Sequence, residues 1–555
     1  MRSVPVTCTK TPMTLGSNKE EKEDILKDYL SSPFNPGSSP QVVQIKSSNF
    51  ENFIDVQKKN DSTSATHYQP LHSNVKWSED QMAVINQISH QIHEIKSMTP
   101  QISKTMIVQG RAGTGKSMII KCLTSLSHEH LGSNSYILAA STGVSAVLID
   151  GKTMHSVFQL PTKSQDYSPL TGDRAKTLSD TLENVKFVIL DEYSMIGWKT
   201  LAMISRRCKE ATRITDEDFG GLNVVLLGDI NQLPPVKDNP LYARMCRTNL
   251  ALEGKSIIKN FHKKFLLTSC HRHNDERFLK MLNNLSEYNV TNDDFHLIRS
   301  RFSTAVSTQD QEQFTIPNAL HLFSSKEDVK TYNMKKLPQL IDEETGDYAP
   351  IIKITAKDNC SNAQQIQEAE GLQRDLYVAK NCNITLKTNL WVDKKLVNGT
   401  QGKIIDILYN REDFPAVILC EFPNYTGPSI IPTKIVPIKP MLNSWTDSNE
   451  KKCTRYQFPL CLCYACTIHK SQGITIDKAV IDVGEKDFAL GLTYVAFSRV
   501  RNFTDLIIYP FLPKRLLKQS HSINETLFYY DDIFKDRPYK VQSQGHLECY
   551  RSIAA

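Results

Sequence analysis

Short, continuously apolar runs alternate with helix-like segments along much of the chain after Trp77. Four of these runs, "TMIVQ", "SYILAAS", "VKFVILDE" and "LNVVLLGD", are rich in β-branched and aliphatic residues. Because they are continuous rather than alternating in polarity, they predict strands buried on both faces, as in a parallel sheet. Together with the helical segments between them, the runs predict an α/β domain over residues 76–255.

A second series of apolar runs comes late in the chain, with "LCLCYAC", "AVIDV" and "DLIIYP". Between the two series, residues 370–455 hold runs separated by Gly, Asn and Pro, which is typical of a small antiparallel β module. The pattern therefore predicts a second α/β domain, over residues 256–369 and 456–520, that the β module interrupts. The acidic, irregular stretch at about 335–370 receives no assignment of its own.

Both ends of the chain read as polar tails. Residues 1–75 are rich in Ser, Asn, Gln and Lys, with the turn-forming run "SSPFNPGSSP", and we expect them to be mostly disordered. Residues 521–555 form a second tail in this scheme. No apolar run approaches the roughly 18 residues that a membrane span needs, so a membrane protein is not expected.

Composition permits a nucleic-acid partner without requiring one. The 555 residues contain 66 Lys and Arg against 60 Asp and Glu, a net charge of +6. The 13 cysteines are scattered and often lie within apolar runs, which favours reduced thiols over a disulfide framework. In "CLCYAC", Cys461, Cys463 and Cys466 have no second ligand pair at metal-binding spacing, so core thiols are favoured there.

The segment "GRAGTGKS" follows a predicted strand and opens a predicted helix. In that setting Gly110, Gly113 and Gly115 let backbone N–H groups converge on phosphate oxygens, and the helix N-terminus favours negative charge. Lys116 can reach the β- and γ-phosphates of a nucleotide, and Ser117 can bind Mg²⁺. The segment predicts a phosphate loop.

An acidic motif, "VILDEYSM", follows later in the chain. It places Asp191 and Glu192 at the end of a predicted strand, where open α/β sheets bind their ligands. Asp191 suits Mg²⁺ coordination, and Glu192 suits activation of an attacking water. Upstream, Gln81 in "WSEDQ" is a candidate reader of a nucleobase edge; a solvated helical glutamine fits the spacing equally well.

The motifs taken together are similar to those of one helicase family. "ILAASTGVSAVLIDGKTMHSVF", "FGGLNVVLLGDINQLPPV", "LVNGTQGKI", "ACTIHKSQGITID" and "YVAFSRV" resemble, in order, the motif set of the Pif-type DNA helicases of superfamily 1B, with RecD-type relatives. This resemblance implies two RecA-like P-loop NTPase domains with a small Src-homology-3-like β-barrel inserted in the second.

The resemblance also implies roles for residues outside the phosphate loop. Arg272 in "LLTSCHRH" and Arg499 in "YVAFSRV" match arginines that reach the γ-phosphate, where a permanently charged planar fork stabilises phosphoryl charge. Gln232 matches a residue that links hydrolysis to the DNA track, and Asp229 beside it would support the magnesium shell or the phosphate loop. We group Gly473 with the nucleotide-binding residues, because glycine allows close backbone approach.

Two segments are expected to hold the nucleic-acid backbone. One lies in "TIHKSQG" and the other in the first domain, within "ASTGVSA" and "KTMHS". A buried structural role for the histidine of "KTMHS" is the alternative. The expected contact residues are Thr142, Gly143, His155, Ser156, Thr467, His469, Lys470 and Ser471.

The resemblance implies an ATP- and Mg²⁺-dependent DNA helicase. It would move 5′ to 3′ on single-stranded DNA and act on forked or tailed duplexes in replication, recombination, repair or telomere maintenance. The competing hypotheses are a nucleic-acid-stimulated ATPase switch and an RNA helicase, since backbone contacts alone do not exclude a 2′-OH. The expected compartment is the nucleus, with the mitochondrion as the alternative.

Overall fold

The structure is a computed structural model in which the chain forms two compact units. The α/β unit comprises residues 65–326 and 466–555, and the β unit comprises residues 1–64 and 327–465. Most of the predicted N-terminal tail, and all of residues 521–555, lie outside the described residues. The described residues are 53–60, 75–99, 103–161, 167–243, 245–272, 275–314, 319–342, 346–369, 371–409, 415–430, 434–446, 451–484 and 489–511.

The α/β unit contains a six-stranded sheet in the order β3-β2-β4-β5-β1-β6, and all of its pairings are parallel. Its last strand, β6, pairs with β1 and follows residue 255, at which the sequence pattern ended the first domain. The sheet extends past that residue because "KFLL" is another apolar run. The strands are β1 (Thr105–Gly110), β2 (Tyr136–Ala140), β3 (Lys152–Thr153), β4 (Phe187–Asp191), β5 (Asn223–Gly228) and β6 (Lys263–Leu267).

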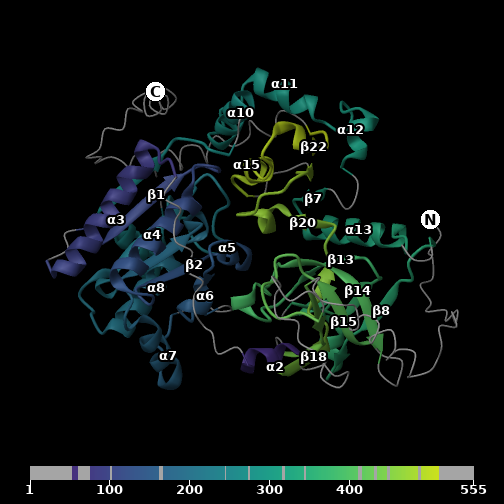
Figure 1. Ribbon diagram of the computed structural model, residues 1–555, viewed down its shortest axis with the longest axis horizontal. Helices are drawn as coiled ribbons and strands as arrows, with labels where there is room; N and C mark the ends of the chain where they lie inside the picture. The colour runs from purple at the N-terminus through teal and green to yellow at the C-terminus, as the bar shows by residue number, and fades with distance from the viewer. Residues whose placement is uncertain are drawn as a thin grey trace, which may run out of the picture. The chain divides into compact units, whose positions relative to one another are not determined.

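Both faces of this sheet are buried, as the continuous apolar runs predicted. Along β4, Phe187 and Ile189 pack with the residues of α3 and α4, whereas Val188 and Leu190 pack on the opposite face with Trp198. Figure 1 shows α3 and α4 running beside these strands. The helices that accompany the sheet are α3 (Glu79–Ser97), α4 (Lys116–Leu131), α5 (Gly143–Leu148), α6 (Met154–Val157), α7 (Gly172–Leu182), α8 (Trp198–Thr212) and α9 (Asn249–Lys259).

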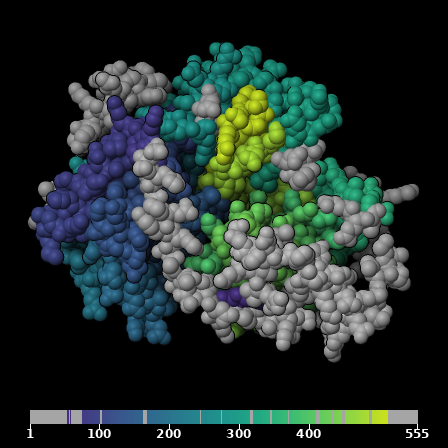
Figure 2. All heavy atoms as spheres, viewed as in Figure 1, coloured from purple at the N-terminus to yellow at the C-terminus, as the bar shows by residue number. Residues whose placement is uncertain are grey.

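A second sheet of the α/β unit has the order β20-β7-β21-β22, in which β21 pairs in parallel with both β7 and β22. Its core unites residues before 326 with residues after 466, and Figure 2 shows these teal and yellow segments packed together. The elements are α10 (Glu276–Ser286), α11 (Asn292–Ser300), α12 (Thr308–Glu312), β7 (Leu320–Phe323), β20 (Ala465–Thr467), β21 (Ala479–Asp482), α15 (Leu492–Phe497) and β22 (Leu506–Ile508).

The β unit is built around a five-stranded antiparallel sheet in the order β16-β15-β14-β13-β19. This sheet contains "LCL" of the run that the pattern gave to the second α/β domain, because Leu460 and Leu462 pair with β13. The strands are β13 (Asn383–Leu386), β14 (Gln401–Tyr409), β15 (Pro415–Glu421), β16 (Ile435–Ile438) and β19 (Leu460–Leu462).

Residues 337–369, which the sequence pattern enclosed in the second α/β domain without an assignment of their own, fold within the β unit instead. They supply short strands that pair antiparallel with later ones: β8 with β12, β9 with β18, and β10 with β11. The elements are α13 (Lys326–Lys336), β8 (Ile352–Thr355), β9 (Lys357–Asp358), α14 (Ser361–Gln365), β10 (Glu368–Ala369), β11 (Leu372–Gln373), β12 (Asp375–Val378), β17 (Met441–Thr446) and β18 (Lys452–Gln457).

One helix lies within the segment expected to be disordered. Helix α2 (Phe53–Asn60) carries Phe53, which is buried against Val417 and Ile430 of the β unit. An isolated helix of this length is marginal in water, so the apolar contact rather than local propensity accounts for it. Within the described residues, no helix combines the length and apolar character that crossing a membrane requires.

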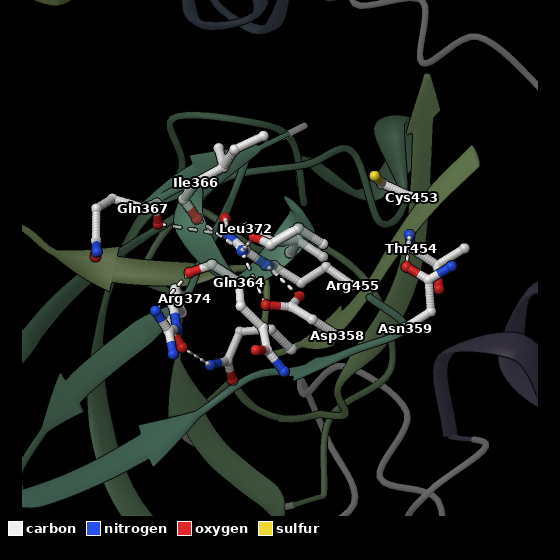
Figure 3. A network of polar contacts seen from close by, with 12 residues as sticks. Asp358, Asn359, Gln364, Ile366, Gln367, Leu372, Arg374, Cys453, Thr454 and Arg455 are labelled. Atoms are coloured by element: carbon white, nitrogen blue, oxygen red, sulfur yellow. Dashed lines mark hydrogen bonds and ion pairs between the residues drawn. The ribbon is translucent and has the colours of Figure 1, made fainter. Parts of the chain in front are cut away.

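A buried ion pair fixes the smaller sheets of the β unit. The Arg455 guanidinium donates to both carboxylate oxygens of Asp358, at 2.8 and 3.1 Å, and the two side chains are 0% and 1% exposed. The same guanidinium donates to backbone carbonyls around it (Figure 3). These carbonyls belong to Ala363, Ile366, Gln367 and Leu372. One side chain thereby replaces the sheet hydrogen bonds that this irregular segment lacks.

We expect Asp358→Asn to destabilise the β unit by about 3–5 kcal/mol, because it leaves the Arg455 charge buried without its counter-charge. Hydrogen exchange of the β18 amides measures the loss locally. The control is Lys439→Gln, which breaks the exposed Lys439–Asp55 pair of the same unit and should cost less than about 1 kcal/mol. Equal exchange in the two variants would contradict the role assigned to Arg455.

Candidate functional site

The predicted phosphate loop lies between β1 and α4, as its sequence context requires. Gly113 and Gly115 have φ angles of 88° and 82°, a left-handed region that suits glycine and turns successive amides toward one space. Lys116 is the first residue of α4, and its Nζ donates to the carbonyls of Gly110 and Arg111 at 2.6 and 3.0 Å. Ser117 follows and is exposed. The loop thus presents an ammonium group, a hydroxyl and a helix N-terminus together.

Gln81 is buried rather than solvated, so the alternative interpretation of a solvated glutamine is wrong. Its Oε1 accepts from the backbone N–H of Ser78 at 3.1 Å, which closes a capping box at the start of α3. Its Nε2 donates to the carbonyl of Thr114 at 3.1 Å. Gln81 therefore ties the first turn of α3 to the phosphate loop.

Asp191 and Glu192 lie at the carboxyl end of β4, and both are buried. Burial, and then the charge of Glu192, raise the pKa of Asp191 to about 7, while nearby Lys116 lowers it. Glu192 has a left-handed backbone with φ 55° and ψ 49°, which is unfavourable for a residue with a side chain. Ser141 Oγ donates to the Glu192 carbonyl at 2.9 Å and helps to hold this conformation.

Gln472 was not among the residues predicted from the sequence. It links the late motif "TIHKSQG" to the Glu192 carboxylate. Its Nε2 donates to Oε2 of Glu192 at 3.0 Å and contacts Ser194 Oγ at 3.3 Å. The side chain is 1% exposed, so little water competes for the bond. The only sequence signal for this residue was its place inside the motif, because the contact spans 280 positions.

The two segments expected to hold nucleic acid meet next to the same carboxylate. Gly473 has a φ of 84°, and a side-chain carbon placed on it would lie 2.6 Å from Ser145 Oγ and 3.6 Å from Glu192 Oε1. Thr142 caps α5 and donates to Ser145 Oγ at 2.9 Å. Only glycine fits at position 473, because a side chain there would be strained and would displace Ser145.

Asp229 anchors a buried hydrogen-bond network behind the phosphate loop. It accepts from Tyr494 Oη at 2.8 Å, from Gln109 Nε2 at 3.2 Å and from the Asn231 N–H at 3.1 Å. Tyr494 Oη also accepts from the Ala112 N–H of the phosphate loop at 3.3 Å. Burial, and then Asp229, raise the pKa of Tyr494 well above its usual value, so the phenol keeps the proton that it donates.

The two candidate arginine fingers occupy different surroundings. Arg272 is half-buried beside Gly113, and its Nη1 donates to the Ser498 carbonyl at 3.5 Å. Arg499 is 2% exposed and donates to the carbonyls of Val495, Ser471 and Ile474 and to Ser498 Oγ. Burial, followed by the positive charge of Arg272, lowers the pKa of Arg499 to about 10. Arg499 thus joins α15 to the "TIHKSQG" loop.

Three buried amide groups near these residues leave an atom without a hydrogen-bond partner among the described residues. They are Asn231 Nδ2, Gln232 Oε1 and Gln472 Oε1. Buried polar atoms of folded proteins are normally satisfied, so such a group of atoms marks a place for water or a polar ligand. Gln232 itself is 3% exposed.

The remaining predicted nucleic-acid contacts differ in exposure. His155, Ser156 and Lys470 are exposed, although partial burial of the His155 imidazole lowers its pKa. His469 is half-buried, and burial followed by the charge of Lys326 lowers its pKa. The other side chains are engaged in the protein: Thr467 is buried, and fully buried Ser471 donates to the Ile468 carbonyl at 2.8 Å.

The comparisons with known proteins agree with the motifs. Residues 76–292 match the sequence model of the PIF1-like helicases. This segment is thus similar to the PIF1-like helicases. The resemblance to Pif-type helicases that the motifs suggested is confirmed.

Relatives extend the likeness beyond this segment. The ATP-dependent DNA helicase PIF1 of Xenopus laevis is 30% identical over 417 residues, which are 74% of this chain and 60% of the relative. Pif1 of Bdellovibrio bacteriovorus is 26% identical over 441 residues, 77% of this chain and 90% of the relative. The chain thus spans less than two thirds of the length of the Xenopus PIF1-like relative.

A solved PIF1-like structure shares the fold. The Bacteroides Pif1 helicase in complex with ADP-AlF3 and single-stranded DNA has a TM-score of 0.60 and 24% identity, and the match covers 82% of this chain and 98% of that one. Together with the parallel sheets, this likeness confirms the predicted RecA-like α/β fold.

We expect Tyr494→Phe to destabilise the α/β unit by about 1.5–3 kcal/mol, because it removes a buried hydrogen bond to the Asp229 carboxylate. Urea unfolding followed by circular dichroism measures the change. The matched control is Tyr288→Phe, which removes a neutral bond from the Gly491 N–H and should cost about 0.5–1.5 kcal/mol. A Tyr494→Phe protein as stable as the parent would contradict the network.

Proposed function

We propose that this chain is an ATP- and Mg²⁺-dependent DNA helicase that moves 5′ to 3′ along single-stranded DNA. It would open forked or tailed duplexes in replication, recombination, repair or telomere maintenance, in the nucleus or, alternatively, the mitochondrion. The observation that carries the proposal is the Gln472–Glu192 hydrogen bond. It joins the candidate hydrolytic carboxylate directly to the loop expected to hold DNA.

In the proposed reaction, Lys116 and the phosphate-loop amides hold the β- and γ-phosphates. Glu192 orients a water molecule and accepts its proton as the water oxygen attacks the γ-phosphorus and the bond to the bridging oxygen breaks. Arg272 and Arg499 would stabilise the charge that spreads over the γ-phosphoryl oxygens. This requires the Arg499 guanidinium to turn some of its donors from backbone carbonyls toward phosphate.

The residues present fit a magnesium ion. Burial, and then the charge of Glu192, raise the pKa of Asp191, so a bound cation would favour its ionised form. Ser117, the second residue of α4, supplies a hydroxyl oxygen. Magnesium favours oxygen ligands and commonly needs only one or two from the protein when phosphates supply others. Ser117 and Asp191 would hold the ion, which supplies positive charge against the phosphate oxygens.

The DNA backbone is proposed to contact residues from both sheets of the α/β unit. Gly473 lies against Ser145, so a shift of the "TIHKSQG" loop would move both expected contact segments relative to each other. His155, Ser156 and Lys470 offer exposed donors for phosphate oxygens. The proposed contact set remains Thr142, Gly143, His155, Ser156, Thr467, His469, Lys470 and Ser471.

We also propose that the β unit contains the Src-homology-3-like insertion of this family. Its five-stranded antiparallel sheet, with a bulged β14–β15 pair, supports this assignment because bulges bend strands toward barrel closure. The motif "LVNGTQGKI" runs from the turn before β14 into that strand.

The proposal is tested by steady-state ATP hydrolysis of the full chain with and without a single-stranded DNA oligonucleotide. We expect DNA to raise kcat at least tenfold, and Glu192→Gln to lower it at least about 100-fold, because a general base typically contributes that much. Duplexes with a 5′ or a 3′ single-stranded tail then report polarity, and only the 5′-tailed duplex should be unwound.

RNA of the same sequence serves as the matched control for the nucleic acid. Equal stimulation by RNA would favour an RNA helicase, and hydrolysis indifferent to both strands would contradict a motor. Stimulation by DNA without unwinding of either tailed duplex would favour the ATPase switch.

We expect Gln472→Met to lower kcat for ATP about tenfold with little change in KM, because the methionine keeps the volume but cannot hold Glu192 in position. A tenfold loss corresponds to about 1.4 kcal/mol of transition-state stabilisation. The control is Gln457→Met, which changes another buried glutamine, in the β unit, and should leave kcat unaltered. A rise in KM at constant kcat would contradict this positioning role.

A further inference from the structure

Two thiols of the β unit lie in contact, although they are far apart in the sequence. The Sγ atoms of Cys360 and Cys453 are 3.5 Å apart, across a separation of 93 positions. Cys453 is fully buried, whereas Cys360 is partly exposed. They pack in a small apolar cluster with Ala363, Trp445 and Ile366.

Beyond the end of β9 the chain continues in the register of its pairing with β18, which brings the two cysteines opposite each other. β18 and β9 pair antiparallel with Arg455 opposite Asp358, and the same register two positions on sets Cys453 opposite Cys360. The intervening residues, Asn359 and Thr454, are hydrogen-bonded to each other, since the Asn359 N–H donates to the Thr454 carbonyl at 3.2 Å. In regular antiparallel strands the next position is a non-hydrogen-bonded one, where Cα atoms are about 4.5 Å apart. That distance lies inside the range of disulfide bonds, which is roughly 4.4–6.8 Å.

Neighbouring contacts hold both thiols in place. Thr454 N–H donates to Asn359 Oδ1 at 2.8 Å, and Asn359 Nδ2 donates to the Lys452 carbonyl at 3.1 Å. Figure 3 shows Asn359 and Thr454 facing each other beside Cys453, with Arg455 next along the strand. Arg455 also donates to the Ala363 carbonyl of α14, whose N-cap residue is Cys360. Disulfide formation consequently requires rotation of side chains and little movement of backbone.

We propose that Cys360 and Cys453 form an oxidation-sensitive pair, which a hydroperoxide converts to a disulfide that staples α14 to β18. The two thiols have different roles in this pair. Cys360 is partly exposed, so the oxidant can reach it, whereas Cys453 is buried and packs against Cys360. All residues that form the pair belong to the β unit.

The chemistry balances with hydrogen peroxide as the oxidant. The Cys360 thiol loses its proton, and the thiolate attacks one peroxide oxygen. The O–O bond breaks, the sulfur becomes a sulfenic acid, and the departing hydroxide combines with the released proton to form water. The Cys453 sulfur then attacks the Cys360 sulfenic acid, the S–S bond forms, and the S–O bond breaks with release of a second water. The two thiols lose two electrons in total, and the peroxide is reduced to two water molecules.

The test treats the full chain with hydrogen peroxide, blocks remaining thiols with a maleimide, and maps cross-linked peptides by mass spectrometry without reduction. We expect a predominant Cys360–Cys453 cross-link that dithiothreitol reverses. Closing so long a loop should raise the melting temperature of the oxidised chain by about 5 °C or more. Accumulation of sulfinic acid at Cys360 without the cross-link would overturn the proposal.

Cys360→Ser is the decisive variant, because serine is favoured at a helix N-cap and should preserve the fold. It should lose both the cross-link and the peroxide-dependent rise in melting temperature. Cys246→Ser, which removes another partly exposed cysteine, should retain both. If the peroxide-dependent rise in melting temperature remained in Cys360→Ser, or was lost in Cys246→Ser, the effect would belong to other thiols. Either outcome would contradict the proposal.

Discussion

The hydrogen bond from Gln472 to Glu192 is the constraint on which the candidate site depends. Glu192 is buried, has a strained backbone and lies beside a second carboxylate, so it cannot be oriented by solvent. Its side chain is instead held by an amide that the chain supplies 280 positions later. The candidate hydrolytic group of the first sheet is thereby oriented by the loop between β20 and β21 of the second sheet.

The phosphate loop already has protein partners where a nucleotide would provide phosphate oxygens. Lys116 donates to two carbonyls of its own loop, and Tyr494 of α15 accepts from the Ala112 amide. A bound triphosphate would replace at least some of these bonds with stronger, charge-assisted ones. Tyr494 belongs to α15, and Arg499, just after this helix, donates to its Val495 carbonyl. Such an exchange therefore reaches the second sheet, which provides a physical route from nucleotide binding to the "TIHKSQG" loop.

The sequence was most informative where chemistry depends on local spacing. The phosphate loop, the buried strands and the acidic pair follow from short motifs and apolar runs, and the structure places Lys116, Asp191 and Glu192 as expected. Contacts between distant segments were not predictable. Gln81 and Gln472 are ordinary polar residues by sequence, and their partners are set by how α3 and the late loop pack.

Parts of the β unit likewise could not be predicted from the sequence. Short strands such as β8 and β9 carry too few apolar residues to produce a periodic pattern, so the sequence left residues 337–369 in the second α/β domain rather than in the β module. Their structure depends on Arg455, whose guanidinium satisfies several carbonyls at once. Nothing in the sequence distinguishes Arg455 from an exposed arginine. Likewise, α2 depends on contacts of Phe53 with residues more than 300 positions away.

The central claim is that the nucleotide site and the "TIHKSQG" loop form one connected structure. Hydrogen exchange of the full chain, compared with and without ADP–aluminium fluoride and Mg²⁺, tests it most directly. The account predicts slower exchange in the phosphate loop and in residues 467–474 together, with both effects lost in Lys116→Ala. Protection confined to the phosphate loop, with exchange in residues 467–474 unchanged, would contradict it.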